Sequence, residues 1–380
     1  MADNNENKVL NVPHLRFPEF SGEWEMASLQ DIAAINPKSD QLQNTFIYID
    51  LEAVEKGELR KIQEIMREEA PSRAQRVIDN NDILFQCVRP YQKNNYIHKI
   101  LNTSNQQWVA STGYAQIRTT ESPNYIYHLL NTDGFNRKVM VRCTGSSYPA
   151  INSEDLATIR FYYTPDKKEQ FKISRLLDLI DERIATQNKI IEDLKKLKSA
   201  ISERLFNAIK GDVVVLEDIG DVVKGKQING EFLSESGKYY VMNGGIEPSG
   251  FYNDYNVEAN TISISEGGNS CGYVQFNACP FWSGGHCYTI QNTTDNVKTE
   301  YLYQFLKSKE SEIMKLRIGS GLPTIQKKDL AKFKITIPNI SEQKVISAFL
   351  SSFERKADVE MNFVNLLLEE KQYLLRQMFI

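Results

Sequence analysis

The sequence is poor in the residues that build disulfide frameworks and metal centres. Its 380 residues include five cysteines and four histidines. An odd number of cysteines without short paired spacings favours reduced thiols in a reducing compartment. Cys271, Cys279, His286 and Cys287 have the residue types of a zinc site, but zinc-binding cysteines usually lie roughly two to four residues apart and these lie further apart. We predict ordinary thiols and no metal site, with zinc as the alternative.

Long apolar runs are also absent. No stretch approaches the roughly 18 consecutive apolar residues that a membrane-spanning helix requires. The segment Met1 to Asn7 lacks the basic-then-apolar order of a secretion signal. We expect a cytoplasmic protein that does not contact a membrane.

The chain has no large excess of charge of either sign. It carries 45 Lys and Arg against 49 Asp and Glu, which gives a net charge of −4. Affinity for nucleic acid rests largely on neutralisation of phosphates by Lys and Arg. Any DNA binding must therefore depend on local patches or on charge supplied by a partner. A hydrophobic content of 41% and a charged content of 25% are typical of a globular protein of two or three domains.

What the sequence does contain is an internal repeat. A Gly-Ser-x-x-Pro-x-Ile motif occurs at Gly145–Ile151 and again at Gly319–Ile325, which is a displacement of 174 residues. A Glu-Gln pair follows each motif, at Glu169-Gln170 and at Glu342-Gln343. The chain is therefore two tandem copies of one plan, as expected for a gene duplication.

Each copy begins with a mixed region and ends with a long charged helix. Short runs with β propensity occur at Tyr125–Tyr127, Val213–Val215 and Thr261–Ile264, and Pro165 and Pro338 mark the start of the helical segments. The helical segments have apolar residues at alternating steps of four and three, which is the pattern of a coiled-coil seam. The predicted seam residues are Ile173, Leu177, Ile180, Ile184, Gln187, Ile191, Leu194, Lys198, Ile201 and Leu205, and then Ile346, Leu350, Phe353, Ala357, Glu360, Val364, Leu367, Lys371, Leu374 and Met378.

These patterns predict an α+β protein with two mixed α/β globular domains separated by two long helices. We expect the helices to form an antiparallel coiled coil, which would relate the two globular domains by a pseudo-two-fold axis. Polar residues interrupt both seams at matching positions, either to fix register or because long side chains there reach water. The predicted boundaries are a first domain over 1–165, a first helix over 166–210, a second domain over 211–337 and a second helix over 338–380.

We find no catalytic motif. The segment Gly220–Gln227 resembles a phosphate-binding loop but ends in Gln where Ser or Thr should hold magnesium. Asp166, Asp193 and Lys195 have the residue types of a metal-dependent nuclease, but the last two flank a seam residue on a solvated helix face. The four histidines lie far apart in sequence. We predict a chain without catalytic residues.

Polar and aromatic loops are the remaining candidates for function. One loop follows the apolar run Ile83–Phe85 and combines cations with side chains that can pair with adenine or guanine edges. Glycine-rich loops are its counterpart in the second half, although a solvated loop or a hairpin turn explains such residues equally well. The candidate DNA-binding residues are Arg89, Tyr91, Gln92, Lys93, Asn94, Asn95 and Tyr96, and in the second half Asn243, Gly244, Gly245, Gly268, Asn269 and Ser270.

The pattern as a whole resembles the specificity subunit of type I restriction-modification systems. The resemblance lies in Pro13–Phe20, in Asp82–Phe85 with Val88-Arg89-Pro90, in Asn243–Ile246 and Ile264–Gly268, and in the paired Gly-Ser-x-x-Pro-x-Ile and Glu-Gln motifs. It covers nearly the entire chain, and the order of the motifs and their duplication make it specific.

The resemblance implies two target recognition domains, each of which reads one half of a bipartite, asymmetric DNA sequence. It also implies that the two helices act as a spacer and dock two methyltransferase subunits, to which restriction subunits are added. Methylation and cleavage, with S-adenosylmethionine, ATP and magnesium, would then belong to the partner subunits, and this chain would hold no cofactor.

Two other functions stay open at this stage. A fused restriction or methyltransferase enzyme with an unrecognised active site predicts activity from the purified chain. A coiled-coil scaffold that binds proteins predicts no sequence-dependent retention of DNA even when methyltransferase partners are present.

Overall fold

The computed structural model describes residues 10–99, 106–319 and 321–380. These residues form two compact units. The first unit is built from two segments of the chain and the second from one. The first unit comprises the chain up to Thr186 together with Phe363–Ile380, and the second comprises Gln187–Asn362. The segment Met1 to Asn7 and residue Ser320 of the second Gly-Ser motif lie outside the described residues.

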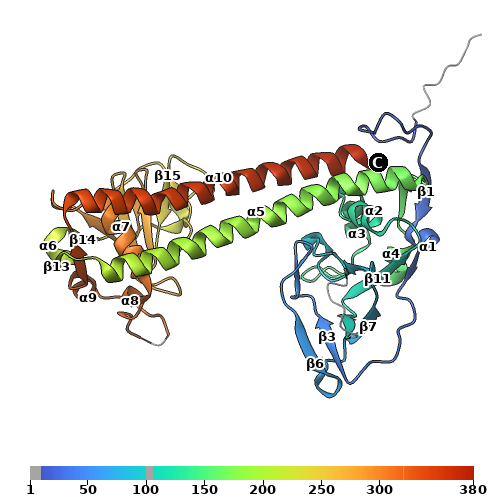
Figure 1. Cartoon of the computed structure of the whole chain (residues 1–380), viewed down its shortest axis with the longest axis horizontal. Coiled ribbons are helices and arrows are strands. Elements are labelled where there is room, and N and C mark those ends of the chain that lie inside the picture. The colour runs from blue at the N-terminus through green and yellow to red at the C-terminus, as the bar shows by residue number, and fades with distance from the viewer. Residues whose placement is uncertain (1–9, 100–105, 320) are drawn as a thin grey trace, which may run out of the picture. The chain divides into compact units, whose positions relative to one another are not determined.

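The first unit contains two four-stranded sheets (Figure 1). One sheet is antiparallel with the strand order β2-β11-β8-β9, and the other has the order β6-β3-β10-β7 with β3 and β10 parallel. The elements are β1 Glu25–Ser28, α1 Leu29–Ile32, β2 Ala33–Ile35, β3 Thr45–Ile49, β4 Val54–Glu55, β5 Glu58–Leu59, β6 Gln63–Met66, β7 Ala74–Ile78, β8 Ile83–Gln86, β9 Tyr96–Ile97, β10 Gln107–Ser111, β11 Tyr114–Thr119, α2 Pro123–Leu130, α3 Asp133–Arg142, α4 Ser153–Ala157, β12 Arg160–Tyr163 and the long helix α5 Lys167–Ala208.

The second unit has the same plan in a shorter form. Its main sheet is antiparallel with the order β14-β20-β17-β18, and a smaller sheet has the order β16-β15-β19 with β15 and β19 parallel. The elements are β13 Asp212–Val215, α6 Leu216–Ile219, β14 Asp221–Lys224, β15 Tyr239–Met242, β16 Phe251–Tyr252, β17 Thr261–Ser265, β18 Val274–Asn277, β19 Trp282–Ser283, β20 Cys287–Gln291, α7 Thr299–Ser308, α8 Glu310–Met314, α9 Lys327–Ala331, β21 Lys334–Ile337 and the long helix α10 Ile340–Met378.

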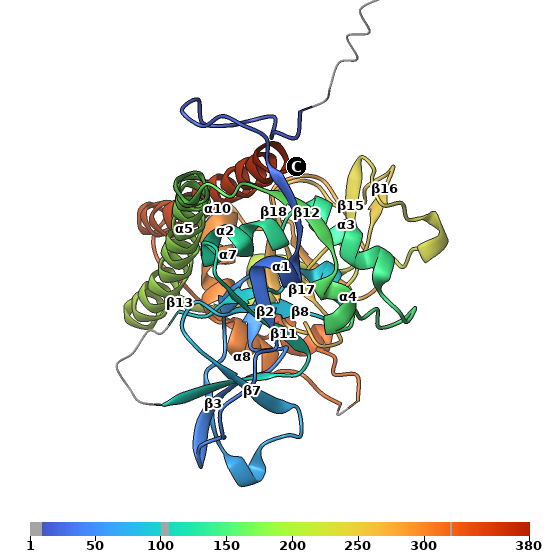
Figure 2. The ribbon, with the colours of Figure 1, turned by 90° about the vertical axis from the view of Figure 1, so that its right-hand side faces the viewer.

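The duplication therefore extends to the topology of each unit. The strand pair β1–β12 of the first unit corresponds to β13–β21 of the second, and both pairs are antiparallel. The sheet β2-β11-β8-β9 corresponds to β14-β20-β17-β18 in strand order. In the first unit the two sheets lie next to each other (Figures 1 and 2), and Gln116 Nε2 of β11 donates to Val77 O of β7 at 2.9 Å.

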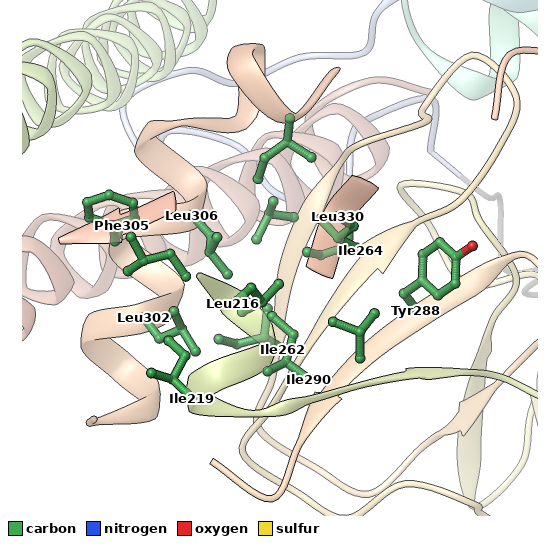
Figure 3. Close-up of a cluster of buried hydrophobic side chains, with 14 of the residues drawn as sticks. Leu216, Ile219, Ile262, Ile264, Tyr288, Ile290, Leu302, Phe305, Leu306 and Leu330 are labelled. Atoms are coloured by element: carbon green, nitrogen blue, oxygen red, sulfur yellow. The ribbon is translucent and has the colours of Figure 1, made fainter. Parts of the chain in front are cut away.

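The core of the second unit lies between helix α7 and the sheet. Figure 3 shows Leu302, Phe305 and Leu306 of α7 facing Ile262 and Ile290 of the sheet. All five side chains are buried. Helix α7 presents these residues on one face because they follow the spacing of one side of an α-helix. This packing fixes β17, the strand that leads into the glycine-rich loop.

Within each unit the long helices run antiparallel. In the first unit Asp181 of α5 pairs with Lys371 of α10, with Oδ2 and Nζ 2.7 Å apart, and Arg183 lies over the ring of Phe363. In the second unit Gln187 contacts Glu360, and Lys198 Nζ lies 2.7 Å from Glu354 Oε1. All twenty predicted seam residues are buried or half-buried. The two seam lysines pair with carboxylates of the other helix, so they are not simply solvated.

One sequence prediction is wrong. The run Tyr125–Tyr127, which we expected to be extended, lies inside helix α2. Pro123 at the first turn starts this helix, because proline is compatible with the beginning of a helix, and Tyr125 and Ile126 are then buried against the rest of the unit. Burial has overridden the β propensity of these aromatic and β-branched residues. The other two runs lie in strands β13 and β17, as expected.

Candidate nucleic-acid interface

The loop after β8 has a defined and unusual backbone. Arg89 and Lys93 have φ angles of +54° and +53°, which non-glycine residues seldom adopt, and a single 3-10 turn, Pro90–Gln92, lies between them. The loop is joined to the first Gly-Ser-x-x-Pro motif by backbone hydrogen bonds. Arg89 N donates to Pro149 O at 2.7 Å, and Ile151 N donates to Cys87 O at 3.0 Å.

Buried amides hold this loop from beneath. The side chain of Gln86, which is buried, donates to Gln92 Oε1 at 3.0 Å and accepts from Asn94 N at 3.1 Å. Asn95 is also buried, accepts from Gln86 N at 2.8 Å and donates to Asn131 Oδ1 at 3.0 Å. A network in which each buried amide is hydrogen-bonded fixes one loop conformation.

An ion pair fixes the far end of the loop. Lys93 Nζ lies 2.7 Å from Asp133 Oδ1 and 3.2 Å from Asn131 O. The hydrogen bond from Lys93 lowers the pKa of Asp133 below its usual value, and Arg376 of α10 contributes to the same effect. Both charges are partly exposed, so the pair positions the loop more than it stabilises the fold.

The surface of the loop borders a cavity of about 690 Å³. The guanidinium of Arg89 stacks on the ring of Tyr148 at 4.5 Å, and 63% of Tyr148 is exposed. Arg73 also lines the cavity, and the described part of the chain gives it no carboxylate partner. The cavity therefore combines cations, an aromatic face and amides. The lining residues are Leu51, Glu52, Val54, Glu55, Arg60, Arg73, Gln86, Val88, Arg89, Gln92, Asn94 and Tyr148.

The loop after β17 in the second unit has the same backbone plan. Gly268 and Gly272 have φ angles of +75° and +93° and stand at the places of Arg89 and Lys93, both displaced by 179 residues. Gly268 N donates to Pro323 O of the second Gly-Ser-x-x-Pro motif at 3.1 Å, as Arg89 N does to Pro149 O. The two loops are thus equivalent pieces of the duplicated fold.

The Asn243-Gly244-Gly245 segment lies against the second loop. The hydroxyls of Ser265 and Ser270 both donate to Gly244 O, each at 2.5 Å. Gly244 has a φ of +85°, and a Cβ there would lie 2.8 Å from the carbonyl oxygen of His286. Only glycine permits this close approach. Two glycine-rich motifs that are distant in sequence therefore meet at one place.

Comparisons with known proteins decide the family. The model of the type I restriction modification DNA specificity domain matches residues 21–196 and 210–367, which is most of the chain and one match per copy. The chain belongs to the type I restriction-modification DNA specificity family. This family is non-catalytic, and the specificity subunit recognises DNA.

Relatives and solved structures agree with this assignment. A putative type I specificity subunit of Mycoplasma genitalium is 22% identical over 67% of this chain and 70% of its own length. Another from Mycoplasma pneumoniae is 33% identical over 42% of each chain. The crystal structure of a type I S subunit from M. genitalium has the same fold, with a TM-score of 0.65, 17% identity and coverage of 97% of this chain and 99% of that one.

The structure places most of the predicted contact residues of the specificity subunit at the surface of the two loops. Tyr91 and Asn269 are exposed, and Arg89 and Ser270 are half-exposed. Asn95, Tyr96 and Gly244 are instead buried, and the hydrogen bonds of Asn95 and Gly244 run within the protein. Burial favours a supporting role for these three residues, and the DNA contacts of the others stay predictions.

Sequence reasoning missed several residues at the same places. Tyr148 and Leu322 occupy the equivalent variable position of the repeated motif and are 63% and 82% exposed. A large side chain at one of the positions that differ between two otherwise repeated motifs is the signal that could have indicated them. Glu266 and His286 were also missed as a pair, because nothing in the sequence shows that they lie together.

The cysteines do not form a metal centre in the described part of the chain. Among residues 10–99, 106–319 and 321–380, no group of three His, Cys, Asp or Glu side chains is placed to hold a metal ion. Cys271 and Cys287 are buried, whereas Cys279 is exposed. Burial raises the pKa of Cys87 to about 12 and that of Cys287 to about 11, so both are neutral thiols rather than nucleophiles. No helix within the described ranges is long and apolar enough to cross a membrane.

Proposed function

We propose that this specificity subunit reads a bipartite, asymmetric DNA site, with one half-site for each unit. The reading surfaces are the loop after β8 with the 145–151 motif, and the loop after β17 with the 319–325 motif. The observation that carries the proposal is that one backbone plan presents different side chains in the two units. An Arg89–Tyr148 stack in the first unit corresponds to Gly268 and Leu322 in the second.

The chemistry of the first loop suits duplex DNA. Arginine can pair with the O6 and N7 of guanine, and glutamine or asparagine with the N6 and N7 of adenine. Arg89, Gln92 and Asn94 line one cavity with Arg73, which is available for a phosphate. The near-neutral charge of the chain means that partners supply part of the attraction to DNA.

We further propose that the two long helices dock two methyltransferase subunits, to which restriction subunits are added. Large apolar side chains outside the seam are exposed on both helices and provide apolar surface that a protein partner can bury. In the first unit they are Phe171, Leu179, Leu366, Leu368 and Tyr373, and in the second they are Leu197, Val345, Phe349 and Val359. The partner subunits use S-adenosylmethionine, ATP and magnesium, and they methylate an adenine that is flipped out of the duplex. We place this complex in the cytoplasm.

Sequencing of methylated adenines tests this function. Cells that carry the methyltransferase subunits with this chain should methylate one bipartite sequence, and cells without the chain should not. Replacement of Gly268–Tyr273 with the loop of a relative should change one half-site only. The same methylation without the chain, or a change in both halves, would exclude the proposal.

Purified protein separates the alternatives. A fused enzyme would cleave or methylate DNA when magnesium or S-adenosylmethionine is added to this chain alone, whereas a specificity subunit would not. A coiled-coil scaffold would retain no specific duplex even after methyltransferase subunits are added.

A further inference from the structure

A histidine in the second unit stands beside a buried carboxylate that is not fully hydrogen-bonded. The Nδ1 of His286 lies 3.7 Å from Oε2 of Glu266, and 62% of the His286 side chain is exposed. Glu266 itself is 8% exposed. His286 directly precedes β20, and Glu266 directly follows β17, so both residues belong to the glycine-rich loop region described above.

The two oxygens of Glu266 have different surroundings. Oε1 accepts hydrogen bonds from Lys224 Nζ at 2.6 Å and from Tyr288 OH at 3.0 Å. Oε2 is buried, and no described residue donates a hydrogen bond to it. A buried carboxylate oxygen without a donor is costly, and the neighbouring imidazole is the group placed to offset this cost.

The backbone fixes His286 at this place. Its N–H donates to Asn243 Oδ1 at 3.2 Å, and its carbonyl accepts from Glu266 N at 2.9 Å. Gly244 packs against the same residue so closely that a Cβ would lie 3.0 Å from the Cβ of His286. The side chain therefore projects outward from a rigid base, and its Nε2 is left free of the carboxylate.

The corresponding positions of the first unit carry other residues. Glu266 N donates to His286 O in the second unit, and the matching bond in the first unit runs from Cys87 N to Gly113 O. A thiol and a glycine thus stand where the second unit has a carboxylate and an imidazole. The pair is a feature of one recognition domain, not of the shared fold.

We propose that His286 contacts a backbone phosphate of the DNA half-site read by the second unit, and that Glu266 is its positioning residue. This inference rests on the proposed function and adds one contact to it. An imidazolium donates a charge-assisted hydrogen bond to a phosphate oxygen, and most protein–DNA hydrogen bonds go to phosphate and sugar. Lys224, which is 52% exposed, adds a second cation to the same place.

The charged groups around His286 come from three elements. Lys224 lies at the end of β14, Glu266 follows β17, and Tyr288 belongs to β20. Lys224 and Glu266 offset each other in charge, so the exposed imidazole is the group of this cluster that remains to contact a phosphate.

The test measures binding of the target duplex by this chain in complex with its methyltransferase subunits. We plot log affinity against log salt concentration. For His286→Gln at pH 6 the slope of this plot should decrease in magnitude by about one, because one phosphate contact is lost. We expect an affinity decrease of about threefold to tenfold that is the same for every duplex sequence. His286→Lys should retain the affinity and its salt dependence, and Glu266→Gln should lower the affinity by less than His286→Gln does.

His14→Gln is the matched control, because His14 is an exposed histidine of the first unit. It should leave the affinity and its salt dependence unchanged. If His286→Gln retains the wild-type affinity and salt dependence, or if it alters only the preference at one base pair, the phosphate contact is excluded. If the wild-type complex binds no specific duplex, the proposed function fails first, and that outcome is seen before any variant is made.

Discussion

At the scale of single residues, one glutamine in each copy joins the start of the long helix to the start of the neighbouring helix. Gln170 Oε1 accepts from Ser122 N at 3.0 Å, and its Nε2 donates to Thr164 O at 2.7 Å. Gln343 does the same with Lys298 N at 2.8 Å and Pro338 O at 2.9 Å. Both glutamines are fully buried. The repeated Glu-Gln motif is therefore a structural joint.

We predict that Gln343→Ala destabilises the second unit by about 2–4 kcal/mol, because it leaves several backbone groups buried without partners. Urea denaturation followed by the fluorescence of Trp282, which lies in this unit, measures the change. Gln372→Ala is the control, since Gln372 is exposed on α10. Equal stability of the two variants would show that the joint contributes nothing.

A buried histidine should make the first unit sensitive to acid. His98 is fully buried, its ring lies 4.8 Å from that of Trp108, and within the described residues neither ring nitrogen has a hydrogen-bond partner. Burial lowers the pKa of His98 from 6.5 to about 4. The unfolded chain therefore takes up a proton at a higher pH than the folded chain.

The sign of the effect follows from this difference. The free energy of unfolding has its full value above about pH 6.5. It decreases as the pH falls toward about 4, by up to about 3 kcal/mol. His98→Phe should keep the ring packing and remove this part of the pH dependence. Denaturation of both proteins at pH 7 and pH 4.5, followed by Trp108 fluorescence, measures it. Parallel pH profiles for the two proteins would contradict the prediction.

At the scale of elements, the polar contact inside the seam fixes how the helices of the second unit meet. Gln187 contacts Glu360, and both are buried. Replacing Gln187 alone leaves Oε2 of Glu360 without its donor, although Oε1 keeps its ion pair with Lys356, whereas replacing both by leucine makes this layer of the seam apolar. We predict that the double variant Gln187→Leu with Glu360→Leu is more stable than Gln187→Leu alone by about 1–4 kcal/mol. Thermal unfolding of the single and double variants measures this coupling, and additive effects would exclude it.

The sequence predicted some elements better than others, for physical reasons. The seam positions could be predicted because a period of 3.5 residues over ten positions in each helix is a strong local signal. The loops after β8 and β17 could be predicted from their composition. The helical conformation of Tyr125–Tyr127 could not be predicted, because the burial of these residues depends on distant parts of the chain. The Glu266–His286 pair could not be predicted either, because β17 and β20 must pair before the two side chains meet.

At the scale of the whole molecule, the two long helices should set the separation of the half-sites. Helix α5 has 42 residues and α10 has 39, and neither contains a proline or a glycine. Seven residues inserted into each helix, after Thr186 and after Asn362, would keep the seam in phase and add about 10 Å at about 1.5 Å per residue. We predict that the gap between the half-sites then widens by about three base pairs at roughly 3.4 Å each.

Sequencing of methylated adenines measures the new gap, while both half-site sequences should stay the same. The insertion points lie at corresponding levels of the seam, because Arg183 contacts Phe363 and Gln187 contacts Glu360. An insertion of five residues in each helix is the control: at about 3.6 residues per turn it rotates the following seam residues by about 140°, away from the partner helix, so it should abolish methylation. Methylation at the original spacing after the seven-residue insertions would show that the helices do not set the distance.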